Sequence, residues 1–82
     1  MTHYTDTQTF TFDRRADDEN ITVFANGGSV NLEVQVSPVQ WVQPDNMNLP
    51  YTTDVSEMVI VAGKTIRITP LDGAEYNFGD GI

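Results

Sequence analysis

The hydrophobic pattern of the chain is most pronounced over residues 56–71. An unbroken apolar run at 58–62 is followed by strict alternation of apolar and polar residues over 65–69, and Gly63 and Lys64 separate the two halves. Alternation with a period of two is the pattern of a half-buried strand. A glycine followed by a polar residue suits a tight turn. The stretch therefore predicts a β-hairpin whose inner face needs a second apolar surface to cover it.

Strand patterns recur along the rest of the chain. They fall at residues 7–13, 21–25, 30–37, 39–43 and 75–78. Turn-forming residues or charged connections separate these segments, and no segment has a helical period. Six or seven short strands at intervals of about 8 to 12 residues are typical of sandwiches and barrels. We therefore predict an all-β fold, a small antiparallel β-sandwich or open barrel of the immunoglobulin-like or jelly-roll-like kind, without a substantial helix.

The apolar positions of these segments form the predicted core. Trp41 is assigned to it because burying a tryptophan removes about 200 Å² from water. The predicted core residues are Phe10, Phe12, Ile21, Val23, Val30, Leu32, Val34, Val36, Trp41, Ile60, Ile66, Ile68, Tyr76 and Phe78.

The length of 82 residues allows a single domain over 1–82, and a chain of this size buries only roughly 60% of its unfolded surface. We expect a flexible N-terminal arm over residues 1–6 and a short tail over 79–82. The chain has no cysteine and one histidine, which excludes disulfides and a Cys₂His₂ metal site as reinforcement. Oligomerisation remains, so a homodimer or homotrimer is expected.

The net charge of −8 limits the classes of partner. Only four cations, Arg14, Arg15, Lys64 and Arg67, are available to contact phosphates, so we expect no nucleic-acid binding. The N-terminus lacks the basic and apolar regions of a signal peptide, and no apolar stretch is long enough for a membrane helix. Synthesis in the cytoplasm, without membrane association, is the expectation.

Catalytic patterns are lacking. His3 lies near the terminus, and no serine has a base partner within the pattern of the sequence. The acidic run at 17–19 does not have the spacing of an EF-hand calcium loop. We therefore expect no enzymatic activity, no metal and no cofactor.

The connection over residues 44–55 is long for so small a domain, and long loops concentrate partner contacts. Met47 and Leu49 lie among asparagines and prolines, where an isolated monomer would expose them, and Tyr51 follows. Phe24 points away from the apolar face of its strand. We predict that Phe24, Met47, Leu49 and Tyr51 bind a partner protein.

Two stretches carry a family resemblance. Gly27-Gly-Ser-Val-Asn-Leu-Glu-Val places a Gly-Gly turn before an alternating strand, and residues 61–73 contain the pattern Gly-x-Thr-x-Arg-x-x-Pro before a tight turn. With a tryptophan-containing strand between them, they resemble small β-sandwich structural proteins of tailed bacteriophages. The resemblance implies a non-enzymatic virion protein, most of all a capsid decoration (cement) protein. It would bind other virion proteins of the capsid or tail, often as a trimer or dimer.

Two other functions remain open. Trp41, Tyr51 and Tyr76 could form an aromatic platform, as in a carbohydrate-binding or host-attachment module of a phage tail or fibre. The acidic composition is also compatible with a DNA-mimic inhibitor, although the acidic residues are dispersed among turns.

Overall fold

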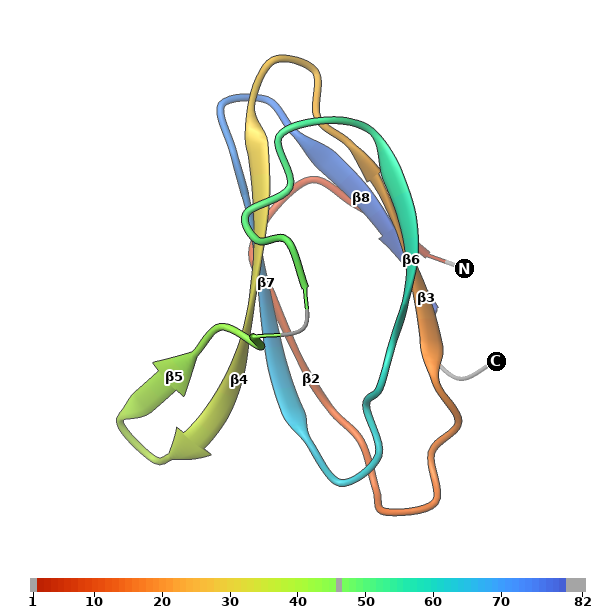
Figure 1. Ribbon diagram of the computed structural model, residues 1–82, viewed down its shortest axis with the longest axis vertical. Helices are drawn as coiled ribbons and strands as arrows, with labels where there is room; N and C mark the ends of the chain where they lie inside the picture. Colours follow the sequence, from red (N-terminus) through yellow and green to blue (C-terminus); the bar gives the residue numbers. More distant parts are fainter. Residues whose placement is uncertain (1, 46, 80–82) are drawn as a thin grey trace.

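The computed structural model describes residues 2–45 and 47–79, which form two four-stranded antiparallel sheets that face each other (Figure 1). Sheet A contains, in spatial order, β1 (Thr2–Tyr4), β8 (Glu75–Phe78), β3 (Glu19–Phe24) and β6 (Val55–Val59). Sheet B contains β2 (Gln8–Thr11), β7 (Thr65–Leu71), β4 (Ser29–Ser37) and β5 (Gln40–Val42). The described residues contain no helix. The all-β, two-sheet expectation is confirmed, with eight strands in place of six or seven.

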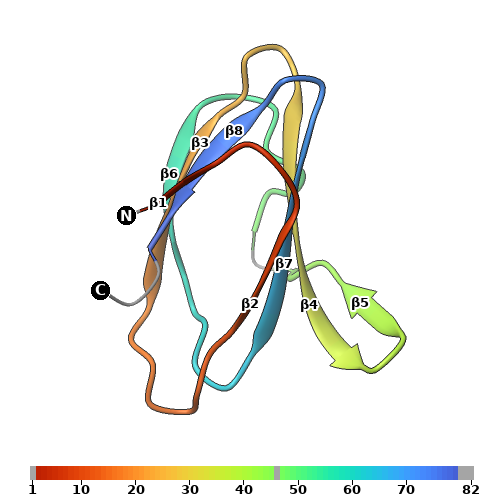
Figure 2. The same cartoon turned by 180° about the vertical axis from the view of Figure 1, so that it is seen from behind.

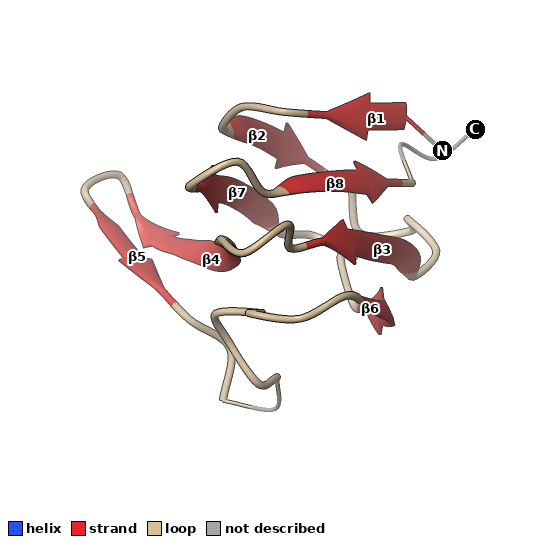
Figure 3. Cartoon of the chain, turned by 90° about the horizontal axis from the view of Figure 1, so that it is seen from above, coloured by secondary structure: helices blue, strands red, loops and turns tan. Residues whose placement is uncertain are grey.

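The strand pairs are nested. β1 pairs with β8, β2 with β7, β3 with β6 and β4 with β5, all antiparallel. Further pairs, β3 with β8 and β4 with β7, join these into the two sheets. Consecutive strands therefore lie in opposite sheets, except for β4 and β5, which form a hairpin (Figures 2 and 3).

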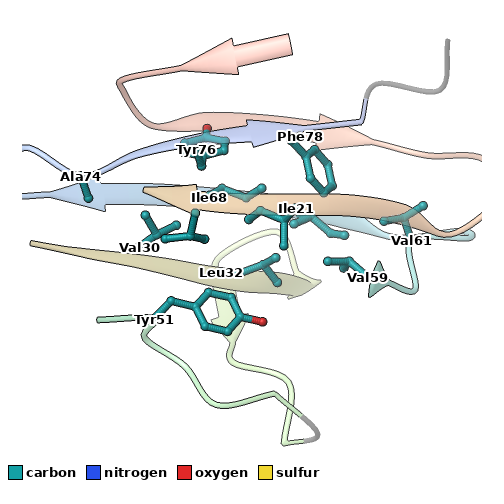
Figure 4. Packing of buried hydrophobic residues seen from close by; sticks show 12 residues of the cluster. Ile21, Val30, Leu32, Tyr51, Val59, Val61, Ile68, Ala74, Tyr76 and Phe78 are labelled. Carbon is teal, nitrogen blue, oxygen red and sulfur yellow. The ribbon is translucent and has the colours of Figure 1, made fainter. Parts of the chain in front are cut away.

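The core lies between the sheets because each strand turns its apolar positions inward. Figure 4 shows this cluster, with side chains from both sheets in contact. The predicted core residues that are fully buried are Ile21, Val23, Val30, Leu32, Ile66, Ile68, Tyr76 and Phe78. Phe10, Phe12 and Val34 are partly buried against the cluster, and Val59 and Val61 join it from the run at 58–62. The ring centroids of Phe10 and Phe78 lie 4.9 Å apart, and this contact links β2 to β8.

Three predicted core residues lie elsewhere. Val36 and Ile60 have 55% and 56% of their surface exposed, and Trp41 is half-buried on the outer face of sheet B. Val36 lies past Val34, the last β4 residue that pairs with β7, and at the register shift between Gln35 and Ser37. Ile60 follows the last residue of β6. The sequence period could show neither where the opposite sheet ends nor where the β4–β5 pair shifts its register.

The predicted hairpin over residues 56–71 is wrong. β6 pairs with β3 in sheet A, and β7 pairs with β2 and β4 in sheet B, so the two strands face each other across the core. The turn was located correctly, since Gly63 has a φ of 71° and the amide of Lys64 donates to the carbonyl of Val61. Both halves bury an apolar face, and they do so from opposite sides. Periodicity reports that a strand is half-buried and does not report its neighbour.

The N-terminal segment differs from the expected flexible arm. Thr2–Tyr4 form the edge strand β1 of sheet A, and the ring of Tyr4 stacks on Tyr76 with centroids 5.3 Å apart. On the outer face, His3 places Nδ1 2.5 Å from Oδ1 of Asn77 and Nε2 2.6 Å from Oε1 of Glu75. These contacts explain why a polar segment is held as a strand. Of the predicted tail, only Gly79 belongs to the described residues.

The contacts of His3 predict a pH dependence of β1. Both ring nitrogens face acceptors, so the protonated ring donates two hydrogen bonds. The pKa of His3 is therefore raised above 6.5, first by Asn77 and then by Glu75. A raised pKa stabilises the folded state fully below the unfolded value, and this contribution is lost as the pH rises through the folded value. An NMR titration of this single imidazole should give a midpoint above 6.5.

Two variants provide the controls for this titration. Asn77→Ala and Glu75→Gln should each lower the midpoint, because the first removes a hydrogen-bond acceptor and the second removes the negative charge beside the ring, and amide exchange in β1 should become faster. A midpoint at or below 6.5 in the unaltered chain would contradict the arrangement of the His3 side chain.

Candidate functional site

The β4–β5 hairpin extends beyond the body of the sandwich. β4 pairs with β7 only as far as Val34, and its last residues pair with β5 alone. A register shift between Gln35 and Ser37 marks a bulge in this part of the hairpin, and bulges increase the local bend and twist. Figures 1 and 3 show the hairpin standing away from sheet A. Its inner face therefore continues the inner face of sheet B without an opposing sheet.

Three exposed valines lie on this projecting hairpin. Val42 is on its inner face, since it pairs with the inward-facing Val34, and Val36 lies at the register shift of β4; 40% of the surface of Val42 and 55% of that of Val36 is exposed. Val39 lies in the turn and is 92% exposed. We call Val36, Val39 and Val42 the hairpin valines. Single exposed apolar residues are common on protein surfaces, whereas a cluster on one projecting element indicates a contact surface.

A shallow cavity of about 120 Å³ adjoins the hairpin between β4 and β6. Its apolar lining includes Leu32, Val34 and Val59, and Glu57 and Lys64 are the charged residues that line it. Met58 and Ile60, which also line it, are exposed at its β6 side. Val34 belongs both to the cavity and to the pair with Val42, so the apolar surface runs from the hairpin to the free edge of sheet A.

The residues predicted to bind a partner are not brought together. Tyr51 is 4% exposed and belongs to the core, and its backbone exchanges two 2.9 Å hydrogen bonds with Val30. Met47 and Leu49 are partly buried against the core, so the connection over 44–55 folds back onto the sandwich. Phe24 is half-buried on the outer face of sheet A, with its ring 5.9 Å from that of His3.

Sequence reasoning missed the hairpin valines as a candidate contact surface. It placed Val36 in the core and assigned no role to Val39 or Val42. One signal was available, since no charged residue lies between Glu33 and Asp45 in a chain with a net charge of −8. An uncharged, valine-containing hairpin is unusual for a solvent-exposed surface, where charged residues normally dominate.

The aromatic platform of Trp41, Tyr51 and Tyr76 does not form, because both tyrosines are buried between the sheets. Trp41 remains, on the outer face of sheet B. The guanidinium of Arg67 lies 4.2 Å from the centroid of its ring and also donates to Oε1 of Glu33, at 2.9 Å from Nη2. Polar side chains occupy the rest of this face, among them Thr9, Asn31, Gln35 and Gln43.

Residues 2–45 and 47–79 offer little support for a metal site, a catalytic site or a membrane span. No group of three histidine, cysteine, aspartate or glutamate side chains in this part of the chain could hold a metal ion. A second cavity, of about 380 Å³, adjoins the β2–β3 connection, where Asp13, Arg15, Asp17 and Glu19 line it without an imidazole or a thiol. None of the helices that a membrane span requires is found in the described part of the chain.

The two buried tyrosines differ in their hydroxyl groups. The Tyr76 hydroxyl donates to the carbonyl of Asp6 at 3.2 Å, which holds the β1–β2 connection against β8. The Tyr51 hydroxyl is buried and has no hydrogen-bond partner among the described residues. Burial raises the pKa of both phenols.

This difference predicts opposite effects of the same substitution. Tyr76→Phe should lower the free energy of unfolding by about 1 kcal/mol, since it removes a buried hydrogen bond. Tyr51→Phe should leave it unchanged or raise it by up to about 1 kcal/mol, because it removes an unsatisfied buried hydroxyl. Urea denaturation of both variants measures the effects. Equal destabilisation of the two would show that the Tyr51 hydroxyl has a partner in solution.

Comparison of this chain with protein-family profiles, with curated proteins and with solved structures finds no match.

Proposed function

We propose that the chain is a non-enzymatic structural protein of a bacteriophage virion, most specifically a capsid decoration protein that binds another virion protein through the hairpin valines. One observation carries the proposal. This chain of 82 residues exposes Val36, Val39 and Val42 to solvent on an element that projects from its body. Burying them against a partner removes this exposed apolar surface from water.

The connectivity of the strands supports the proposal. We infer a minimal jelly roll, because nested antiparallel pairs give the order β1-β8-β3-β6 in one sheet and β2-β7-β4-β5 in the other. Double-sheet jelly rolls of eight strands occur in viral capsid proteins and in lectins. The step from this fold to a virion is an analogy, since one fold serves many functions.

The distribution of charge also favours an apolar contact over DNA mimicry. Asp13 and Asp17 lie in the β2–β3 connection, at the opposite end of the molecule from Asp72 in the β7–β8 turn (Figure 1). Glu33 is paired with Arg67. A DNA mimic needs acidic groups along one face, whereas here they are divided between the two ends of the molecule. A like-charged periphery keeps such a protein soluble and limits unspecific contacts.

The proposal predicts that the chain cosediments with purified capsids or tails of the phage that encodes it. Val39→Asp should weaken this binding at least about tenfold, the effect of losing one well-buried aliphatic contact. Leu71→Asp is the matched control, since it adds the same charge at an exposed residue at the far end of β7. Its binding should be unchanged.

Both variants should keep the circular dichroism and melting temperature of the unaltered chain, because both positions are exposed. Failure of the unaltered chain to bind any virion component would overturn the proposal. Equal loss of binding in both variants would show that the hairpin valines are not the binding surface.

A carbohydrate-binding module is the second candidate, and the position of Trp41 favours it. The indole is half-buried on a polar face, beside a guanidinium and among amide and hydroxyl groups. Aromatic rings stack on the apolar faces of sugars, and such polar groups bind sugar hydroxyls.

Fluorescence of this single tryptophan tests the second candidate. A glycan ligand should quench the emission or shift it, and Trp41→Ala should abolish glycan binding while binding to capsids is retained. An emission that no glycan from the host cell surface changes would exclude the module.

A further inference from the structure

We propose that the free edge of β6 binds an extended, basic segment of another protein, which joins sheet A as an added strand. The segment carries an arginine or lysine between two aliphatic residues, each of them two positions away. This inference goes beyond the proposed function, because it uses a surface other than the hairpin valines and holds or fails without them.

The backbone of β6 is unpaired along one edge. β6 pairs with β3 alone, and Figure 3 shows it at the margin of sheet A. Within residues 2–45 and 47–79, no backbone hydrogen bond joins β6 to a segment other than β3. The outward N–H and C=O groups of an edge strand are the groups that another extended backbone pairs with in strand addition. An extended polypeptide is therefore the class of ligand that fits this edge.

The other three sheet edges are shorter. β1 and β5 have three residues each and β2 has four, whereas β6 has five. Pro38 and Pro44 lie two residues from the ends of β5, and β6 contains no proline. Short strands and prolines prevent pairing with a further strand, since proline lacks the N–H that a ladder needs. β6 is thus the edge of the described sheets best suited to strand addition.

The cavity between β4 and β6 lies beside this edge. Val59 lines it from β6, Leu32 and Val34 line it from β4, and Met47 lines it from the connection between β5 and β6. A strand added to β6 extends the inner face of sheet A, so its inward side chain next to Val59 enters this apolar space. Main-chain pairing supplies affinity in strand addition, and pockets for alternate side chains supply specificity. The cavity therefore selects an aliphatic residue.

Glu57 adds a charge requirement to the edge. It pairs with the buried Ile21 and so lies on the inner side of its strand. Burial first, and then the charge of Glu57, raise the pKa of the Tyr51 phenol, which agrees with a carboxylate close to the core. Lys64 lines the same cavity, but Glu57 forms no ion pair with any described residue. Opposite charges directly across two strands stabilise their pairing, so a cation on the added strand complements this carboxylate.

These positions determine the pattern of the partner segment. Val55, Glu57 and Val59 share the inner face of β6, so the added strand presents an aliphatic, a basic and an aliphatic residue at positions i, i+2 and i+4. The net charge of −8 also attracts a basic segment. Inward-pointing charges protect edge strands from unselective pairing. Glu57 therefore excludes strands that place an acidic residue opposite it.

Fluorescence anisotropy with a synthetic nonapeptide tests the inference. The labelled peptide has Val-Thr-Arg-Thr-Val at its centre and two threonines at each end, and a control peptide has glutamate in place of arginine. The unaltered chain should bind the arginine peptide with a Kd below about 1 mM, as in a small, transient contact. The glutamate peptide should bind at least about tenfold more weakly, because it places like charges opposite each other. Binding of the arginine peptide should weaken as salt screens the pair.

A reversal of charge at Glu57 provides the decisive variant. Glu57→Arg should prefer the glutamate peptide, because the variant repels arginine and attracts glutamate at the same position. Glu57 is exposed, so the variant should keep the circular dichroism of the unaltered chain. Asp6→Arg is the matched control, since it makes the same change of charge at an exposed residue of the β1–β2 connection, at the opposite margin of sheet A. It should prefer the arginine peptide.

NMR locates the contact on the unaltered chain. Addition of the arginine peptide should change the amide shifts of residues 55–59 most strongly. The inference is overturned by shifts centred on another edge, by no binding of the arginine peptide at about 1 mM, or by a preference that Glu57→Arg leaves unchanged. Val39→Asp should bind the peptide like the unaltered chain. Failure of strand addition and failure of capsid binding are therefore observed separately.

Discussion

Contact between the inner faces of the two sheets holds this chain together, because disulfides are excluded and a core of this size is marginal. The two faces are not of equal extent. Sheet B continues past Val34 into a hairpin that sheet A does not reach. The same mismatch explains the exposure of Val36 and Val42 and the cavity beside β6. The candidate site is thus the uncovered remainder of the surface that stabilises the fold.

The sequence predicted the strands well and their partners poorly. Alternation located β3, β4, β7 and β8 with the correct residues inward, because side-chain period depends on the backbone alone. The prediction for residues 56–71 was wrong because two neighbouring half-buried strands show the same alternation whether they pair as a hairpin or lie in opposite sheets, as they do here. It also missed β1, which is polar and depends on contacts of His3 and Tyr4 with a strand more than seventy residues away.

The candidate site was less predictable than the fold, for a related reason. Polar context suggested that Met47 and Leu49 would be exposed, but the backbone of Tyr51 pairs with Val30, and Met47 and Leu49 pack against the core. The pattern of β4 assigned Val36 to the core, but this residue is 55% exposed and lies at the register shift of the β4–β5 pair. Only the extent of the opposite sheet decides that this position is open to solvent, and that extent is a property of three dimensions.

The nested pairing has a consequence for how the chain folds. Of the strand pairs described here, β4–β5 is the only one between neighbours in the sequence, and every other pair closes a longer loop. Loop-closure entropy makes long-range pairs slow to form, so folding that starts at β4–β5 and adds outer pairs in turn follows the least costly order. The segment best placed to nucleate the domain is therefore the one that the finished core leaves uncovered.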